Sequence, residues 1–367
     1  MKKFALVAVA LIALAVLAWN LFGGTAAVVE TALPEFPDFP PPLAALTDER
    51  EGTVYFETST PFDLDVILRA PETARPTTGV GTLFVPDAAT PETPVPAMVI
   101  LHGSGGISPG REIEYGQLLR DNGIASLVVN YYAPRGVTDE TNYMVRVLSV
   151  TEFDAVADAY GALKLLATHP AIDGNRIGVM GFSYGGMAAR FAIDERIRRI
   201  LAPDRRGFAA AADFYGPCFQ KLGTRATSGA PLLTLRGTED ASNDLEACKK
   251  RENELRSIGV RVENHVFKGV GHAWEVNTER KMFPDSPYVA GCEVVYDESG
   301  LSSVDGTPIV NVPVETSREE RIAIRMQSGS GMADCVESGY VIGRDDSTRA
   351  KANDILIQFL ARTFGLI

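Results

Sequence analysis

The sequence predicts an α/β domain in which helices cover both faces of a mostly parallel central sheet. From about Gly52 onward, apolar strand-like runs alternate with helical patterns, which is typical of parallel strands connected by helices. The expected strands are Thr53–Phe56, Gly79–Val85, Ala97–Leu101, Ala125–Tyr131, Arg176–Met180, Phe208–Phe214, Pro231–Leu235 and Arg261–Phe267. The expected helices between them are Glu112–Asn122, Thr141–Thr168, Tyr184–Asp194 and Asn243–Ser257. The two strands before Ala97 have no helix between them, so we expect an antiparallel pair at one edge of the sheet.

Composition and charge indicate a globular protein that does not bind nucleic acid. The chain has 367 residues, of which 46% are hydrophobic and 22% charged, as in an ordinary globular protein. The formal net charge is −12, and an acidic surface repels the phosphates of nucleic acids. We therefore expect no nucleic-acid partner.

The N-terminal segment has the pattern of an export signal. Lys2 and Lys3 precede an apolar run, Phe4–Trp19, and small residues follow up to Ala27. Residues 1–27 are therefore predicted to be a signal peptide or, if uncleaved, an N-terminal membrane anchor. In both cases we expect the rest of the chain to be periplasmic or secreted, with membrane contact only through this segment. Residues 28–50 read as an extended Pro-rich linker, and the folded domain is expected over 51–367.

The four cysteines suit an oxidising compartment. None of them lies in a Cys-x-x-Cys pair, so neither a metal site nor dithiol redox chemistry is expected. Cys218 follows one predicted strand and Cys248 lies on the helix after the next, which brings them close in a parallel sheet. Cys292 and Cys335 would then pair with each other. The spacing leaves the other pairings, and free buried thiols, open.

Residues 281–343 break the alternation of strands and helices. They contain frequent Gly, Pro and Ser residues, which favour turns, and two short strand-like pieces, Glu293–Tyr296 and Ile309–Val312. A final amphipathic helix follows over Asp345–Thr363. We interpret 281–343 as an insertion before the last helix. It forms a lid or pocket wall, or it only decorates the surface.

Ser183 is the predicted nucleophile. It lies in Gly181-Phe182-Ser183-Tyr184-Gly185, directly between a predicted strand and a predicted helix. A serine on such a sharp turn needs glycines around it, because a Cβ there would strike the strand or the helix. The turn exposes the hydroxyl, and the helix start behind it favours negative charge.

A serine hydroxyl needs a base and a third group that orients that base. His272 lies in a loop after the last predicted strand of the sheet, where reactive groups gather, so it is the predicted base. Asp240 follows the preceding strand and is the predicted acid, with Glu239 and then Asp244 as the alternatives. The order Ser, acid, His along the chain is that of the α/β-hydrolase fold.

Two backbone N–H groups are predicted to stabilise the oxyanion. One belongs to Tyr184, the residue after the nucleophile. The other belongs to Ser104 in the turn His102–Gly106, which follows the central strand. Small residues in this turn allow the backbone to approach a substrate.

These motifs together resemble the dienelactone hydrolase family. The resemblance covers residues 80–275 and the last helix, and rests on six segments: 102–106, 132–136, 173–178, 181–186, 237–240 and 271–274. It implies an α/β-hydrolase fold, a Ser183–Asp240–His272 triad, and cleavage of small-molecule esters or lactones without a cofactor. The family's prototypes carry cysteine where this chain has Ser183, and they lack the export segment and the insertion. Residues expected near the substrate are His102, Tyr132, Arg135 and Trp274.

Three other functions are compatible with parts of the sequence. A peptidase or an acyltransferase would use the same triad, because function depends on the pocket and not on the fold. An exported binding protein with an inactive triad is the non-enzymatic alternative. A dinucleotide-binding turn at Gly178, Gly181 and Gly185 is disfavoured, because no acidic residue ends a strand about 20 positions later.

Overall fold

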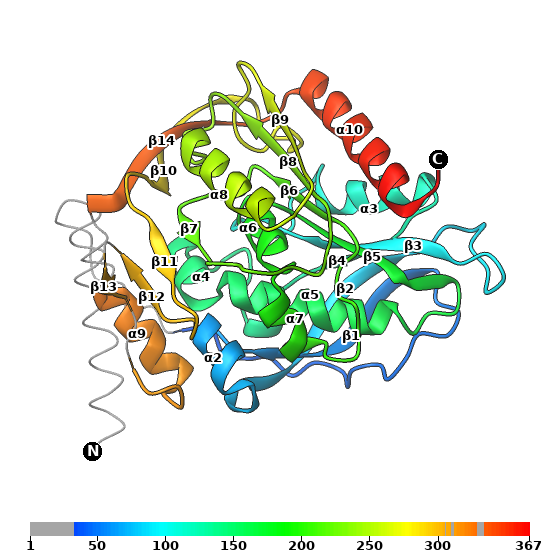
Figure 1. Ribbon diagram of the computed structural model, residues 1–367, viewed down its shortest axis with the longest axis horizontal. Coiled ribbons are helices and arrows are strands. Elements are labelled where there is room, and N and C mark those ends of the chain that lie inside the picture. Colours follow the sequence, from blue (N-terminus) through cyan, green and yellow to red (C-terminus); the bar gives the residue numbers. More distant parts are fainter. Residues whose placement is uncertain (1–32, 305, 310–311, 329–333) are drawn as a thin grey trace.

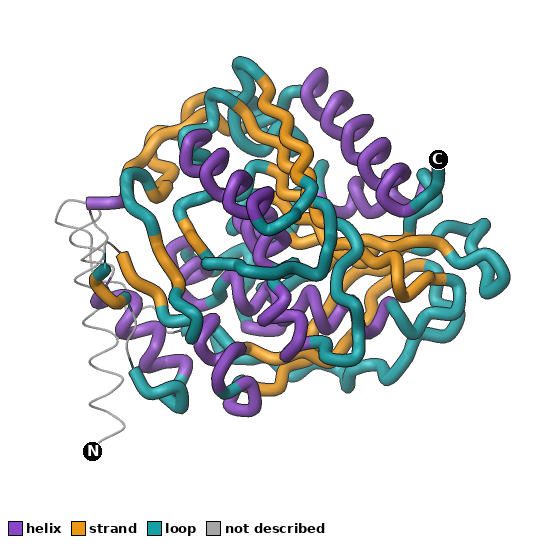
Figure 2. The backbone as a smooth tube through the Cα atoms, viewed as in Figure 1, coloured by secondary structure: helices purple, strands orange, loops and turns teal. Residues whose placement is uncertain are grey.

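An eight-stranded sheet forms the centre of the protein (Figure 2). The computed structural model describes residues 33–304, 306–309, 312–328 and 334–367. The strand order is β1-β2-β4-β3-β5-β6-β8-β9. The bounds are β1 Glu51–Thr60, β2 Arg75–Phe84, β3 Val95–Leu101, β4 Ala125–Val129, β5 Ile172–Phe182, β6 Ala211–Phe214, β8 Leu232–Gly237 and β9 Val262–Phe267.

Strand directions match the expected α/β-hydrolase pattern. Strands β4, β3, β5, β6, β8 and β9 are parallel neighbours, whereas β2 runs antiparallel to both β1 and β4. The predicted antiparallel pair is therefore present, with β1 at the edge and β2 beside it. All six parallel strands end at one edge of the sheet, where loops can bring reactive side chains together.

Helices cover both faces of this sheet (Figure 1). Their bounds are α2 Leu64–Arg69, α3 Glu112–Asp121, α4 Tyr143–Ser149, α5 Glu152–Leu166, α6 Tyr184–Phe191, α7 Glu195–Leu201, α8 Leu245–Ser257, α9 Arg318–Ser328 and α10 Asp346–Phe364. Side chains of α5, α6 and α7 pack in one core cluster, and those of α3 and α10 pack in the other. Strand β3 contributes Val99 to the first cluster and Ile100 to the second, as the alternation of a doubly covered strand requires.

The sequence expectation for helices needs two corrections. The single helix expected over 141–168 is two helices, because Thr151 is extended and caps α5 in a reciprocal capping box with Asp154. Helices α2, α7 and α9 were not predicted. With six and seven residues, α2 and α7 are too short for the sequence to show a helical period. Helix α9 lies in the insertion, where only short strands were expected.

The Pro-rich segment 33–50 is extended, as expected, but it is also packed against the domain. Leu46 is buried, and its N–H donates to Thr168 Oγ1 at 2.9 Å. The ring of Phe36 lies 3.9 Å from the Arg75 guanidinium and 5.1 Å from that of Arg318. The extended segment 33–50 therefore connects the edge of the sheet to α9. The predicted export segment, residues 1–27, lies outside the described residues, and no helix within the described ranges is long and apolar enough to cross a bilayer.

The insertion consists of two small sheets and α9. Strands β10 (Lys281–Val289) and β14 (Val336–Ile342) form an antiparallel pair. Strands β11 (Val294–Tyr296), β12 (Ser302–Val304) and β13 (Thr307–Pro308) continue from β7 (Gln220–Lys221) of the core. The strand expected over Ile309–Val312 lies partly outside the described residues. β13 ends at Pro308, and residues 310 and 311 lie outside the described ranges.

Ion pairs attach the insertion to the core, and one disulfide lies within each of these two parts. Arg321 of α9 binds Asp63 at 3.0 Å and Asp65 at 2.9 Å, and its guanidinium is buried. Figure 1 shows α9 beside α2 at one end of the molecule. Cys218 pairs with Cys248, and Cys292 pairs with Cys335, which is the predicted connectivity.

The buried ion pair of Arg321 makes a testable contribution to stability. We expect Arg321→Ala to lower the free energy of unfolding by about 3–5 kcal/mol, because the buried Asp65 carboxylate loses its cation and Asp63 keeps only Arg325. Urea denaturation measures this change. As a control, Arg199→Ala removes an ion pair whose guanidinium is 72% exposed, and should lower that free energy by less than about 1 kcal/mol. Equal losses in the two variants would contradict this account of how α9 is held.

Candidate active site

Ser183 lies at a strained turn between β5 and α6. Its φ of 53° and ψ of −117° are unusual for a residue other than glycine. A Cβ at Gly181 would lie 2.2 Å from the Gly185 carbonyl oxygen, and one at Gly185 would lie 2.3 Å from that of His102. The close approach of strand, helix and turn therefore requires glycine at both positions. Ser183 itself is partly exposed to solvent.

Asp240 and His272 form a direct hydrogen bond. His272 Nδ1 lies 2.6 Å from Asp240 Oδ2, and both side chains are buried. Asn243 Nδ2 donates to the same Asp240 oxygen at 3.0 Å, while Ser242 donates to the other at 2.5 Å through its hydroxyl and 3.1 Å through its N–H. These bonds stabilise the ionised carboxylate and fix its orientation. Sequence reasoning missed Ser242 and Asn243 as supporting residues, because no motif marks them.

The two alternative acids have other partners. Glu239 binds Arg280 at 2.6 Å on the surface. Asp244 caps α8 by accepting from the N–H groups of Glu246 and Ala247 at 2.9 and 3.1 Å. Of the three candidates, Asp240 is the acid in contact with His272.

Tyr215 connects the nucleophile strand with the base. The Ser183 N–H donates to the Phe214 carbonyl at 2.8 Å, and the ring of the next residue, Tyr215, packs 4.5 Å from the His272 ring. Ser183 Oγ and His272 Nε2 have no hydrogen-bond partner among the described residues. Ser183 and His272 are thus linked through Phe214 and Tyr215, and the described residues show no hydrogen bond between the hydroxyl and the imidazole.

A tight turn after β3 lies beside Ser183. Gly106 N–H donates to the Gly103 carbonyl at 3.0 Å, and a Cβ on Gly103 would lie 3.4 Å from Ser183 Cβ. Tyr132 holds the turn by donating its hydroxyl to the Ser104 carbonyl at 2.9 Å. Ser104 thus lies next to the nucleophile, as does Tyr184, which follows it as the first residue of α6.

Three of the four residues expected near the substrate are fully buried. Arg135 is fully buried and binds Asp158 through both terminal nitrogens, at 2.8 and 3.0 Å. Burial lowers the pKa of His102 to about 3, so its neutral ring donates from Nδ1 to the Gly103 carbonyl at 2.7 Å. Trp274 is fully buried against Tyr215. All three side chains are held by contacts within the protein. The fourth residue, Tyr132, is almost as buried, and its hydroxyl holds the turn after β3 by bonding the Ser104 carbonyl.

The insertion contacts His272 directly. Val341 of β14 accepts a hydrogen bond from the His272 N–H at 2.7 Å, and Gly343 N–H donates to the His272 carbonyl at 3.0 Å. The ring of Tyr340 meets the imidazole edge to face, with 5.4 Å between ring centres. Tyr143 of α4 bonds Ser104 Oγ at 3.1 Å from the other side. Two partly exposed tyrosines therefore stand beside the base and the turn.

A second buried carboxyl lies behind the imidazole. Glu275 is fully buried, and its Oε2 accepts from the Tyr215 hydroxyl at 2.6 Å. Burial raises the pKa of Glu275 to about 7, although the Tyr215 hydrogen bond and the Arg111 charge both act to lower it. Nothing in the sequence distinguished this glutamate from a surface residue.

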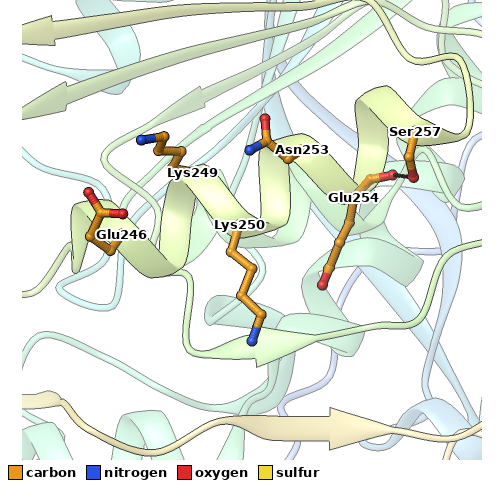
Figure 3. Close-up of a pocket in the computed structure, with 6 residues that line it drawn as sticks. All are labelled: Glu246, Lys249, Lys250, Asn253, Glu254 and Ser257. Atoms are coloured by element: carbon orange, nitrogen blue, oxygen red, sulfur yellow. Dashed lines mark hydrogen bonds between the residues drawn. The ribbon is translucent and has the colours of Figure 1, made fainter.

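One hollow on the surface lies away from Ser183. It has a volume of about 450 Å³ and runs along the outer side of α8 (Figure 3). Its lining residues are Glu246, Lys249, Lys250, Asn253, Glu254 and Ser257. None of these belongs to the cluster around Ser183, so we place the candidate site by its chemistry and not by this hollow. Within the described ranges, no group of three or more His, Cys, Asp or Glu side chains could hold a metal ion.

The sheet topology, the strained serine and the Asp–His pair define the protein as an α/β hydrolase. The model of the dienelactone hydrolase family matches residues 82–299, which is more than half of the chain. The protein belongs to the dienelactone hydrolase family.

Individual relatives are distant. A Bradyrhizobium protein described as a probable 2-oxo-3-(5-oxofuran-2-ylidene)propanoate lactonase is 23% identical over 159 residues, or 41% of this chain. The match spans 62% of that relative's length. A dienelactone hydrolase-like promiscuous phosphotriesterase from metagenomic libraries has a TM-score of 0.47 and 19% identity, covering 62% of this chain and 85% of its own. A thermophilic esterase from Thermogutta terrifontis has a TM-score of 0.43 and 18% identity, covering 53% and 80%.

The raised pKa of Glu275 gives a pH-dependent stability. A carboxyl that is protonated in the folded state up to pH 7, but only up to pH 4.5 when unfolded, contributes stability at low pH that is lost as the pH rises. In Glu275→Gln, the amide has the shape of the protonated carboxyl and stays uncharged at every pH. Relative to this variant, the wild type should lose about 3 kcal/mol of unfolding free energy between pH 4.5 and 8. Urea titrations across this range measure the difference, and a constant difference would show that Glu275 does not titrate as described.

Proposed function

We propose that the protein is an exported serine hydrolase that cleaves carboxylic esters or lactones through an acyl-enzyme. The 2.6 Å hydrogen bond between His272 and Asp240, next to a strained and partly exposed Ser183, is the observation that carries this proposal. Membership of the dienelactone hydrolase family supports the choice of ester bonds.

In the proposed mechanism, Ser183 Oγ attacks the substrate carbonyl while His272 Nε2 takes its proton. The Asp240 carboxylate keeps the Nδ1–H tautomer and stabilises the imidazolium. The backbone N–H groups of Tyr184 and Ser104 would stabilise the oxyanion. His272 then returns the proton to the leaving alkoxide, and water attacks the acyl-enzyme by the same route to release the acid and free Ser183.

Small esters or lactones are the proposed substrates. The Bradyrhizobium relative is described as a lactonase and the Thermogutta relative as an esterase, so both kinds of ester are within the range of related proteins. We assign Tyr340 and Tyr143 to the wall of the substrate site, because the first contacts the His272 ring and the second bonds Ser104. On this reading the insertion forms part of the wall and is not a free lid.

Export is part of the proposal. Two disulfides, Cys218–Cys248 and Cys292–Cys335, are compatible with an oxidising compartment, and the predicted leader at residues 1–27 supplies the route. The periplasm or the extracellular space is therefore the proposed location.

The nucleophile is tested by Ser183→Ala on p-nitrophenyl esters of increasing chain length. We expect kcat to fall by about 10⁴-fold or more, because the variant lacks the attacking atom while its fold is intact. Burst kinetics of the wild type should also reveal an acyl-enzyme. A Ser183→Ala variant that retains most of its activity would refute the mechanism.

The acid is tested by comparing two adjacent carboxylates. Asp240→Asn should lower kcat by about 10³–10⁴-fold, because the amide no longer favours the reactive tautomer of His272. Glu239→Gln, the matched control, loses only a surface ion pair with Arg280 and should stay within about twofold of wild type. If the Glu239 variant loses activity and the Asp240 variant does not, the assignment of the acid is reversed.

A further inference from the structure

A buried glutamate, Glu152, forms two hydrogen bonds with the side-chain hydroxyl of Tyr184. This hydroxyl donates to Glu152 Oε2 and accepts from the Glu152 N–H at 2.9 Å. Glu152 is only 1% exposed and is the first residue of α5. Since burial raises the pKa of the Tyr184 hydroxyl well above its usual value, this group remains a donor at any working pH. Both the donor and the acceptor sides of the hydroxyl are therefore fixed.

The insertion completes this contact from outside the core sheet. Glu152 Oε1 accepts from the Tyr296 hydroxyl at 3.1 Å and from Gln220 Nε2 at 2.7 Å. Tyr296 ends β11 of the insertion, and Gln220 belongs to β7, with which β11 pairs. The insertion also brings Arg325 of α9 into electrostatic contact with Glu152.

All of these polar atoms are removed from bulk water. Tyr296 and Gln220 are 5% and 7% exposed. A buried carboxylate needs its hydrogen-bond donors, and losing one leaves it under-solvated and free to shift. A change at Tyr296 is therefore expected to shift the Glu152 carboxylate, and a shift of that carboxylate moves the Tyr184 hydroxyl bonded to it.

We propose that Glu152 is a positioning residue for the oxyanion site, and that the insertion holds it in place through Tyr296. By fixing the Tyr184 side chain, Glu152 sets the start of α6, and with it the N–H group that follows the nucleophile. This inference rests on the proposed function, because it assigns that N–H to the oxyanion. A displacement of about 1 Å at such a group can reduce the rate substantially.

The test uses Glu152→Gln and Tyr296→Phe in the full chain. Each variant removes or weakens one bond of the buried network without creating a cavity. Tyr288→Phe is the matched control, since it removes a hydroxyl from the same insertion that bonds only the surface residue Glu337. Measurements are kcat and KM on a short-chain p-nitrophenyl ester, and the inhibition constant of phenylboronic acid, whose tetrahedral adduct mimics the oxyanion. Thermal unfolding establishes that each variant is folded at the assay temperature.

We expect Glu152→Gln to lower kcat about tenfold and Tyr296→Phe about threefold, with KM changed by less than about twofold. The inhibition constant of the boronic acid should rise in parallel with the loss of kcat, and Tyr288→Phe should match wild type. A purely structural role predicts a lower melting temperature with kcat and boronate affinity unchanged, and that result would overturn the proposal. If Glu152→Gln does not fold, Tyr296→Phe decides alone by the same criteria.

The Ser183→Ala variant separates the two proposals. If it is inactive while Tyr296→Phe and Glu152→Gln behave like wild type, the serine mechanism stands and only the positioning role fails. If Ser183→Ala is active, the proposed function itself fails.

Discussion

The sharp turn at Ser183 is the constraint on which the rest of the site depends. Its left-handed backbone is possible only because Gly181 and Gly185 let β5, α6 and the turn at His102 approach within contact distance. That approach puts the hydroxyl at the carboxyl edge of the sheet, beside the loops that carry Asp240 and His272. A side chain at either glycine would separate these elements, and the arrangement of the site would be lost with them.

Around this turn, buried polar groups hold each part of the site in place. Ser242 and Asn243 fix Asp240, and Tyr215 with Glu275 supports the ring of His272. The insertion contributes in two places, through β14 on both sides of His272 and through β11 at the Glu152 network. A segment that looks peripheral in the chain thus contacts His272 and, through Glu152, Tyr184. Such preorganisation is what a hydrolase of this class requires.

The sequence predicted most of the fold, because the strands carry strong apolar runs and the catalytic motifs lie at their ends. It predicted the Cys218–Cys248 disulfide because parallel neighbours bring these residues together, and Cys292–Cys335 followed as the remaining pair. It could not distinguish Arg135 as a buried partner of Asp158 from a substrate contact, because burial depends on long-range packing. The burial of Glu152 and Glu275 could not be predicted for the same reason. A lone glutamate in a sequence is usually on the surface, and only the folded structure encloses it.

The most direct measurement is the site of covalent labelling by a fluorophosphonate, read by peptide mass spectrometry on the folded protein. The account predicts a single adduct on Ser183, formed much faster in the wild type than in a His272→Ala variant. An adduct on a different serine, such as Ser108 in Gly106-Ile107-Ser108-Pro109-Gly110, which has the same Gly-x-Ser-x-Gly pattern as 181–185, would contradict it, as would an active enzyme that forms no adduct.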